Sequence, residues 1–154
     1  MPVTRVIASD TRGIAAGKFF FVSFHLDTPT RITVSVTLKS GPPVDSYLVT
    51  EQGLETFQAI AANHLSRGFS AIGKLSEAPL IGSYTRLGMI AAGNDALIID
   101  NSNLGATTLS PEMFKRSAAL VTFTLSAEEF PVQTSTMEQL EAAANRWARA
   151  IVGN

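Results

Sequence analysis

The chain of 154 residues is long enough to bury the core of one domain. Its 12 Lys and Arg nearly balance its 13 Asp and Glu, and the formal net charge of -1 gives no field that attracts nucleic acid or an anionic membrane. The absence of cysteine excludes disulfides, thiolate metal sites and a cysteine nucleophile. Charged residues form only 16% of the chain, against about 25% in soluble domains, so we expect a partner to cover part of the surface.

The N-terminal sequence "MPVTRVIASDTRG" has no basic segment that leads into an apolar run, as a signal peptide requires. No apolar stretch reaches the roughly 20 residues of a membrane span. The sequence therefore predicts a cytoplasmic protein without a membrane partner.

Strands are predicted at 4–9, 18–26 and 31–39. The third, "RITVSVTLK", alternates strictly between apolar and polar residues, which is typical of a strand with one buried face. The second, "KFFFVSFHL", is apolar on both faces, as in a strand that is covered on both sides. The short linker "DTPT" between them predicts a hairpin.

The strand at 44–50, "VDSYLVT", runs directly into a helical pattern, "TEQGLETFQAIAANH". Thr50 is placed to cap the first helical turn, whereas Gly53 weakens that turn. We interpret this helix as the connection from one sheet to the next, with Leu54 and Phe57 closing one end of the core.

Further strands are predicted at 80–89, 96–101 and 118–125, with a polar loop "NSNLGATTLSPE" before the last one. Together these segments predict an all-β fold: an antiparallel β-sandwich of the jelly-roll kind with about seven to eight strands, one inserted helix and a C-terminal helix.

The C-terminal sequence "STMEQLEAAANRWARAIVGN" opens with Ser135 and Glu138 at the spacing of a capping box, which predicts a helix at 136–152. We therefore divide the chain into a sandwich domain at 1–133 and an amphipathic helix at 134–154. One narrow apolar stripe along that helix is the candidate partner-binding surface: Met137, Leu140, Ala144, Trp147 and Ile151. Two roles stay open for the tryptophan, an anchor on its own sandwich and an anchor for a partner.

Three stretches resemble the GOLD-type β-sandwich, the luminal domain of cargo receptors of the early secretory pathway and of bacterial relatives. They are the strand at 43–50, the strand "GNDALIIDNS" at 93–102, and the strand at 21–26. The resemblance covers roughly 6–125 and implies a non-catalytic protein-binding or structural module. The chain lacks the cysteine pair, signal and membrane anchor of that family, so cargo sorting is not implied.

Catalytic motifs are not found, and we interpret His25 and His64 as structural residues because no oriented partner is suggested for either. The segment "DNSN" at 100–103, with Asp95 at the other end of its strand, offers oxygen ligands of the type that calcium prefers. We favour a structural role there, in which Asp100 and Asn101 hold the turn. No cofactor or metal is predicted.

The sequence thus predicts a non-enzymatic structural or interaction module that assembles with itself or a protein partner through an apolar surface and the C-terminal helix. The alternative is a sandwich that binds carbohydrate or another small ligand through the loops at 66–79 and 101–112. An enzyme is the third hypothesis.

Overall fold

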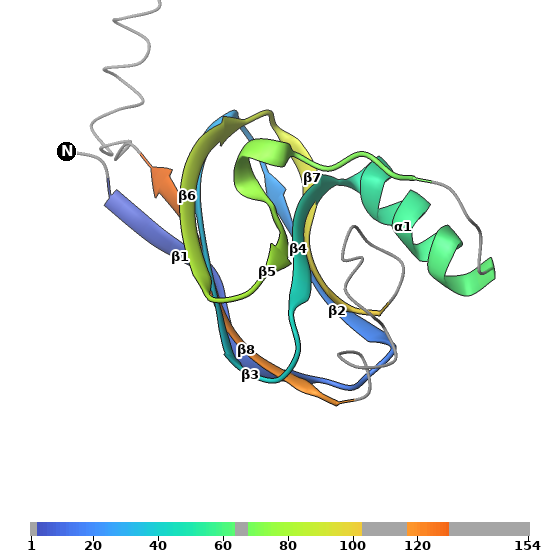
Figure 1. Cartoon of the computed structure of the whole chain (residues 1–154). Coiled ribbons are helices and arrows are strands. Elements are labelled where there is room, and N and C mark those ends of the chain that lie inside the picture. Colours follow the sequence, from blue (N-terminus) through green and yellow to red (C-terminus); the bar gives the residue numbers. More distant parts are fainter. Residues whose placement is uncertain (1–2, 64–67, 103–116, 130–154) are drawn as a thin grey trace, which may run out of the picture.

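The structure is a computed structural model that describes residues 3–63, 68–102 and 117–129. Within these residues eight strands form two antiparallel four-stranded sheets that face each other (Figure 1). Sheet A has the order β1 (Val3–Ile14), β8 (Ala119–Glu129), β3 (Thr30–Ser40) and β6 (Ser83–Ile90). Sheet B has the order β2 (Lys18–Leu26), β7 (Gly93–Asn101), β4 (Val44–Thr50) and β5 (Glu77–Leu80). The predicted antiparallel β-sandwich is confirmed.

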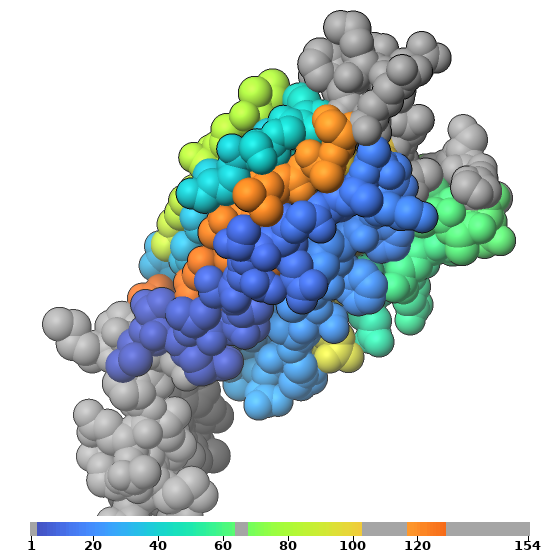
Figure 2. All heavy atoms as spheres, turned by 90° about the horizontal axis from the view of Figure 1, so that it is seen from below, coloured from blue at the N-terminus to red at the C-terminus, as the bar shows by residue number. Residues whose placement is uncertain are grey.

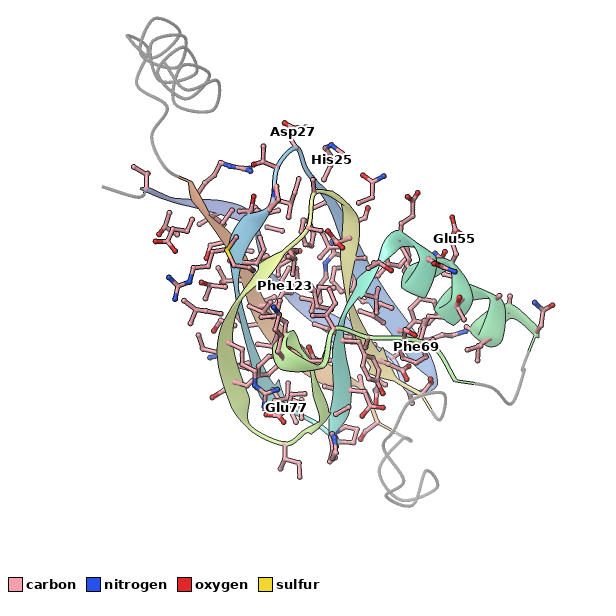
Figure 3. The ribbon with its side chains drawn as sticks, turned by 90° about the horizontal axis from the view of Figure 1, so that it is seen from above. His25, Asp27, Glu55, Phe69, Glu77 and Phe123 are labelled. Carbon is pink, nitrogen blue, oxygen red and sulfur yellow. The ribbon has the colours of Figure 1, made fainter. Side chains whose placement is uncertain are left out.

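The main core lies between the two sheets. The alternation that predicted the strand at 31–39 is reproduced, since Ile32, Val34 and Val36 are fully buried. They meet buried side chains of the facing sheet, such as Leu97 and Ile99. Because alternate residues of a strand point to opposite faces, one face of each strand supplies this core. Phe123 of β8 lies within it (Figure 3).

The hairpin predicted between 18–26 and 31–39 is wrong. Strand β2 pairs with β7 in sheet B, and β3 pairs with β6 and β8 in sheet A, so the linker at 27–29 crosses from one sheet to the other. The physical reason is that both segments have an apolar face to bury. A sandwich buries the two faces against each other, whereas a hairpin would place them side by side in one sheet.

Helix α1 (Glu51–Asn63) covers the outer face of sheet B (Figure 1). It joins β4 to β5, which belong to the same sheet, so the prediction that it connects two sheets is wrong. Phe57 does not close the main core, because it forms a second cluster with Tyr47, Val49 and Phe69. Its ring meets Phe69 edge-on at 5.1 Å between centroids. The predicted cap is confirmed, since the Gly53 amide donates to Thr50 Oγ1 at 3.2 Å.

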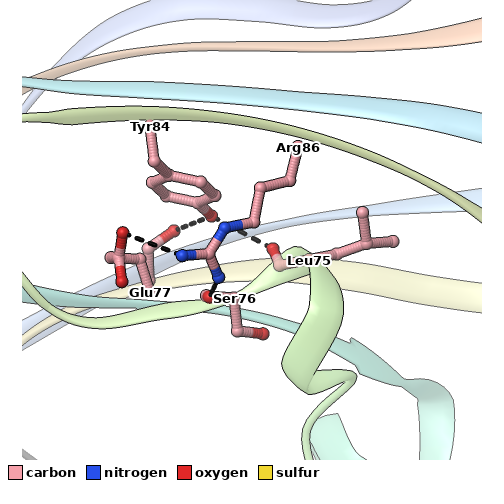
Figure 4. A network of polar contacts seen from close by, with 6 residues as sticks. Leu75, Ser76, Glu77, Tyr84 and Arg86 are labelled. Carbon is pink, nitrogen blue, oxygen red and sulfur yellow. Dashed lines mark hydrogen bonds and ion pairs between the residues drawn. The ribbon is translucent and has the colours of Figure 1, made fainter.

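The single strand predicted at 80–89 is two strands, β5 and β6, separated by a bend at Ile81 and Gly82. A short 3-10 helix, η1 (Gly73–Leu75), precedes β5 and was not predicted. A polar network joins these elements (Figure 4). The Tyr84 hydroxyl contacts Ser46 Oγ at 2.8 Å and donates to the Leu75 carbonyl at 3.2 Å. Arg86 donates to the Ser76 carbonyl and to Glu77, and its guanidinium lies over the Tyr84 ring.

The outer face of sheet A is rich in hydroxyl groups. Cross-strand hydroxyl pairs join β1 to β8 and β3 to β6: Ser9 with Thr124 at 3.1 Å, Thr11 with Thr122 at 3.0 Å, and Ser35 with Thr85 at 3.0 Å. Such pairs stabilise a sheet without charge. Hydroxyl groups therefore make this surface polar in a chain that has few charged residues.

Candidate functional site

The partner-binding residues predicted on the C-terminal helix all lie outside the described residues: Met137, Leu140, Ala144, Trp147 and Ile151. His64, most of the loop at 101–112 and the boundary between the two predicted domains lie outside them as well. His25, Asp95, Asp100 and the loop from residue 68 onward are described. His25 and Asp95 lie at one end of the sandwich, and Asp100 lies at the other.

Asp100 and Asn101 hold the end of β7, as favoured from the sequence. Asp100 Oδ1 accepts hydrogen bonds from the backbone amide and the hydroxyl of Ser102, at 3.1 and 2.5 Å. Asn101 Nδ2 donates to the carbonyls of Ile14 and Ser117, at 3.0 and 3.1 Å. Asp95 lies at the opposite end of the same strand, so these groups do not form one calcium site.

The opposite end of β7 carries a connected polar network. His25, near the end of β2, contacts Asn94 Oδ1 through Nδ1 at 2.7 Å and Asp27 Oδ1 through Nε2 at 3.1 Å. Asn94 Nδ2 in turn donates to Glu51 Oε2 at 3.3 Å. Figure 3 shows His25 and Asp27 together at this end of the sandwich. Both ring nitrogens of His25 therefore face oxygen atoms.

Asp95 lies next to this network and is 6% exposed. Its Oδ2 atom finds no hydrogen-bond partner among the residues that the structure describes. Burial raises the pKa of the Asp95 carboxyl above its ordinary value of 3.8, and the nearby His25 opposes that shift. A buried carboxylate oxygen without a partner costs stability, so it requires an explanation in a native structure.

Two clefts open beside Asp95. The first, of about 360 Å³, is lined by the end of β2, the first turn of α1 and the start of β7: Ser23, Phe24, His25, Glu51, Leu54, Asn94 and Asp95. The second, of about 540 Å³, lies between that same turn of α1, the β6–β7 connection and the loop before η1, with Ile72 and Lys74 in its wall. The two clefts share Glu51, Asn94 and Asp95. Volumes of this size suit small ligands.

Among the described residues, no three His, Cys, Asp or Glu side chains come together in a way that could hold a metal ion. The His25 ring nitrogens are occupied by an amide oxygen and a carboxylate, so the ring does not activate a hydroxyl in this arrangement.

A second surface stands out on the long side of the molecule, where β1 and β2 are the outermost strands of their sheets. We call this surface, made of β1 and β2, the open side. Figure 2 shows β1 running across it, with β8 on one flank and β2 on the other. Two apolar side chains of β1 are exposed here, Val3 at 55% and Val6 at 58%. Arg12 covers the Phe20 ring at 4.8 Å from its centroid.

Sequence reasoning missed the polar network because it did not pair 18–26 with 93–101. His25 and Asn94 are cross-strand partners in the register of β2 and β7. Had that antiparallel pairing been considered, the histidine near the end of one strand and the "GND" segment at the start of the other would have been placed side by side. Glu51 joins the network because α1 lies against sheet B at this end. Sequence periodicity predicts the helix but not where it lies.

No protein-family model matches the chain, and no curated protein matches it. The chain is similar in structure to the pre-peptidase C-terminal domain of a collagenase from Bacillus anthracis, with a TM-score of 0.43 and 9% sequence identity. That similarity covers 76% of this chain and 88% of the collagenase domain. Within the described part of this chain, no helix is long and apolar enough to cross a membrane.

Proposed function

We propose that the protein is a non-enzymatic, cytoplasmic β-sandwich that works by protein assembly, with a second copy of the same chain as its partner. The observation that carries the proposal is the open edge of β1. This strand of 12 residues pairs with β8 alone among the described strands, and its other edge has no strand beside it. Such an edge presents backbone donors and acceptors that fit another strand.

The order of residues along β1 supports self-association. In an antiparallel pair of two β1 strands whose two-fold axis passes between Ile7 and Ala8, Arg5 lies opposite Asp10 of the second copy. In the same register Val6 lies opposite Ser9, and the contact occurs twice because a two-fold interface is self-complementary. Opposite charges directly across an antiparallel pair are stabilising.

A bulge in β1 allows this register, because it places Arg5 and Asp10 on the same face of the strand. The pairing with β8 shifts between Val6 and Ala8, so Arg5 is opposite Ala127 and Asp10 is opposite Phe123. Ala127 and Phe123 both belong to the core, which places Arg5 and Asp10 on the same face of β1. In a regular strand, residues five apart point to opposite faces. The shift therefore brings the two charges to one face, as the ion pair requires.

The exposed apolar side chains of the open side add a hydrophobic component, because their burial in a dimer removes apolar surface from water. The stripe that the sequence predicts on the C-terminal helix is proposed as a second contact: Met137, Leu140, Ala144, Trp147 and Ile151. The resemblance to the GOLD-type domain agrees with a non-catalytic module.

Charge-reversal variants at the contacts between two β1 strands test the proposal. Light scattering coupled to size exclusion measures the molar mass of each variant. Arg5→Asp places two carboxylates opposite each other at both contacts, and Asp10→Arg places two guanidinium groups there. The Kd of the dimer should therefore rise at least tenfold in each variant alone. In each mixed dimer one chain is acidic at positions 5 and 10 and the other is basic at both, so opposite charges face each other at both contacts and no like-charge pair remains. The mixture should recover more dimer than either variant alone.

The double variant that carries Arg5→Asp and Asp10→Arg in one chain completes the test. It restores an opposite-charge pair at both contacts with the signs exchanged, and should dimerise nearly as well as the wild type. A wild-type chain that is a monomer would contradict the β1 interface. Single variants that assemble as well as the double variant would contradict it too.

The small-ligand alternative has its own observation in its favour. The second cleft is lined by Ile72 and Lys74 of the loop at 66–79, which the sequence singled out for binding, together with Glu51 and Gln52. These side chains offer both donors and acceptors, as recognition of a sugar requires. A calorimetric titration with mono- and disaccharides tests it; heat that disappears in Lys74→Ala would favour this function over assembly alone.

A further inference from the structure

We propose that the first cleft binds a primary ammonium group carried on a short alkyl chain. This inference does not depend on the dimer, because the cleft lies at the end of the sandwich and is formed by β2, α1 and β7. The ammonium would be that of a free alkylamine or of a lysine side chain of another protein. Both sources present the same chemistry to the cleft.

The charge of the cleft favours a cation. Two carboxylates, those of Glu51 and Asp95, line it, and neither lysine nor arginine is among the lining residues. A third carboxylate, Asp27, contacts the far side of the His25 ring. Carboxylates only accept hydrogen bonds when they are ionised, so the cleft offers more acceptors than donors. An ammonium group supplies three donors and a positive charge.

Asp95 gives the second and independent reason. Its side chain is almost completely buried, it lines the cleft, and its Oδ2 atom has no hydrogen-bond partner within the described part of the chain. The arrangement costs stability in the free protein. An N–H group of a bound ammonium would satisfy this oxygen and pair with its charge, which accounts for a carboxylate in such a place.

The polar network fixes the opposite wall. Asn94 is held between His25 at 2.7 Å and Glu51 at 3.3 Å, so its amide orientation is set by both partners. Glu51 keeps its second carboxylate oxygen for a ligand, since the described contact uses Oε2. Phe24 and Leu54 form an apolar part of the wall beside Ser23, and this part suits the methylene groups next to the ammonium.

Titration of the full chain with n-butylamine and with n-butanol tests the proposal, using amide chemical shifts in NMR spectra as the readout. The two ligands share their alkyl chain and differ in charge. Butylamine should bind at least tenfold more tightly than butanol and should shift the amides of His25, Asn94 and Asp95. Equal binding of the two ligands, or shifts elsewhere only, would overturn the proposal.

Two variants and a matched control assign the contact. Asp95→Asn should weaken butylamine binding at least tenfold while the variant stays folded, and Glu51→Gln should weaken it severalfold. Glu55→Gln removes the same charge one turn further along α1, where the side chain is exposed and does not line the cleft (Figure 3), and should change affinity less than twofold. If Glu55→Gln weakens binding as much as Glu51→Gln does, the effect is long-range charge and the site is refuted.

A further titration distinguishes the two sources of the ammonium group, a free amine and a lysine side chain. Lysine blocked at both its backbone amine and its carboxyl presents only the side-chain ammonium, whereas butylamine and 1,4-diaminobutane represent free amines. Blocked lysine that binds at least as tightly as butylamine would identify a protein side chain as the ligand. Tighter binding of the free amines would identify a small molecule. Binding of glucose in the absence of amine binding would overturn the proposal in favour of a neutral ligand.

Discussion

The backbone carbonyl oxygen of Ser70 lies 2.7 Å from the point that a β-carbon on Gly53 would occupy. The loop that follows α1 therefore packs against the first turn of the helix at a distance that only glycine allows. The sequence indicated only that Gly53 weakens the helix. The structure shows what this residue makes possible, the close approach of the segment that carries Phe69 into the aromatic cluster under α1.

We expect Gly53→Ala to destabilise the protein by about 1–3 kcal/mol, because an alanine here is overpacked against the Ser70 carbonyl and Val49. At an ordinary helix position the same exchange stabilises by roughly 1 kcal/mol. Ala62→Gly, at an exposed position in the last turn of the same helix, is the control and should cost less than about 1 kcal/mol. Urea denaturation measures both; a stabilised Gly53→Ala variant would show that the loop moves away freely.

Tyr84 should make the protein sensitive to alkaline pH. Burial raises the pKa of Tyr84 to about 12, although Ser46 and Arg86 act in the opposite direction. Because the folded-state pKa is above the ordinary value of 10.0, the stability due to this group is complete below pH 10 and is lost as the pH rises through about 12. Absorbance of the phenolate reports this titration directly.

Tyr84→Phe separates the two contributions of that residue. At pH 7 it leaves Ser46 Oγ and the Leu75 carbonyl without the phenol, and should cost about 1–3 kcal/mol in the free energy of unfolding. Toward pH 12 the difference between wild type and variant should shrink, since the variant has no phenol to ionise. A difference that stays constant from neutral to strongly alkaline pH would contradict the burial of the hydroxyl.

Asp95→Asn should stabilise the free protein at neutral pH, by about 1 kcal/mol, because the buried carboxylate oxygen lacks a partner among the described residues. Burial raises the pKa of Asp95, so the folded state favours its protonated form, and its contribution to stability is greatest below pH 3.8 and declines as the pH rises through the folded-state pKa. The advantage of the asparagine variant should therefore decrease on acidification. Thermal unfolding at neutral pH and just below pH 3.8 checks both parts; a variant that is less stable at neutral pH would contradict them.

Asn101→Ala should destabilise the protein by about 1–3 kcal/mol. Its amide group bonds two backbone carbonyls, one at the end of β1 in a buried place and one before β8 in a partly buried place, and the substitution removes the donor from both. Asn63→Ala is the matched control, because that side chain bonds one carbonyl at an exposed helix end and should change stability by less than about 0.5 kcal/mol. Equal effects in the two variants would argue against the bridging role.

The sequence predicted most strands and the inserted helix because alternation and helical periodicity reflect which face of a segment is buried. Val44 and Leu48 face the main core, and Tyr47 and Val49 join the second cluster with Phe57 of α1. Strand partners were not predictable in the same way, since the order of strands depends on contacts between distant segments. The error at 18–39 shows this, because its short linker is compatible both with a hairpin and with a crossing between sheets.

The candidate site was less accessible still. His25 looked isolated in the sequence because its partners, Asn94 and Asp27, become neighbours only through strand pairing and a turn. Asp95 was noted, but as a calcium ligand together with 100–103, and the length of β7 separates them. The stripe on the C-terminal helix stays a prediction, because those residues are outside the described part of the chain.

The position of β8 has a consequence for how the chain folds. Strands β1 and β3 are joined in one sheet only through β8, which lies between them. Ser9 and Thr124, whose hydroxyls meet across β1 and β8, are 115 residues apart in the chain. During synthesis, sheet A therefore cannot close until nearly all of its residues have left the ribosome, and its early strands wait with unpaired edges. We expect folding in milliseconds to seconds, as for other proteins dominated by contacts between distant residues, rather than in microseconds.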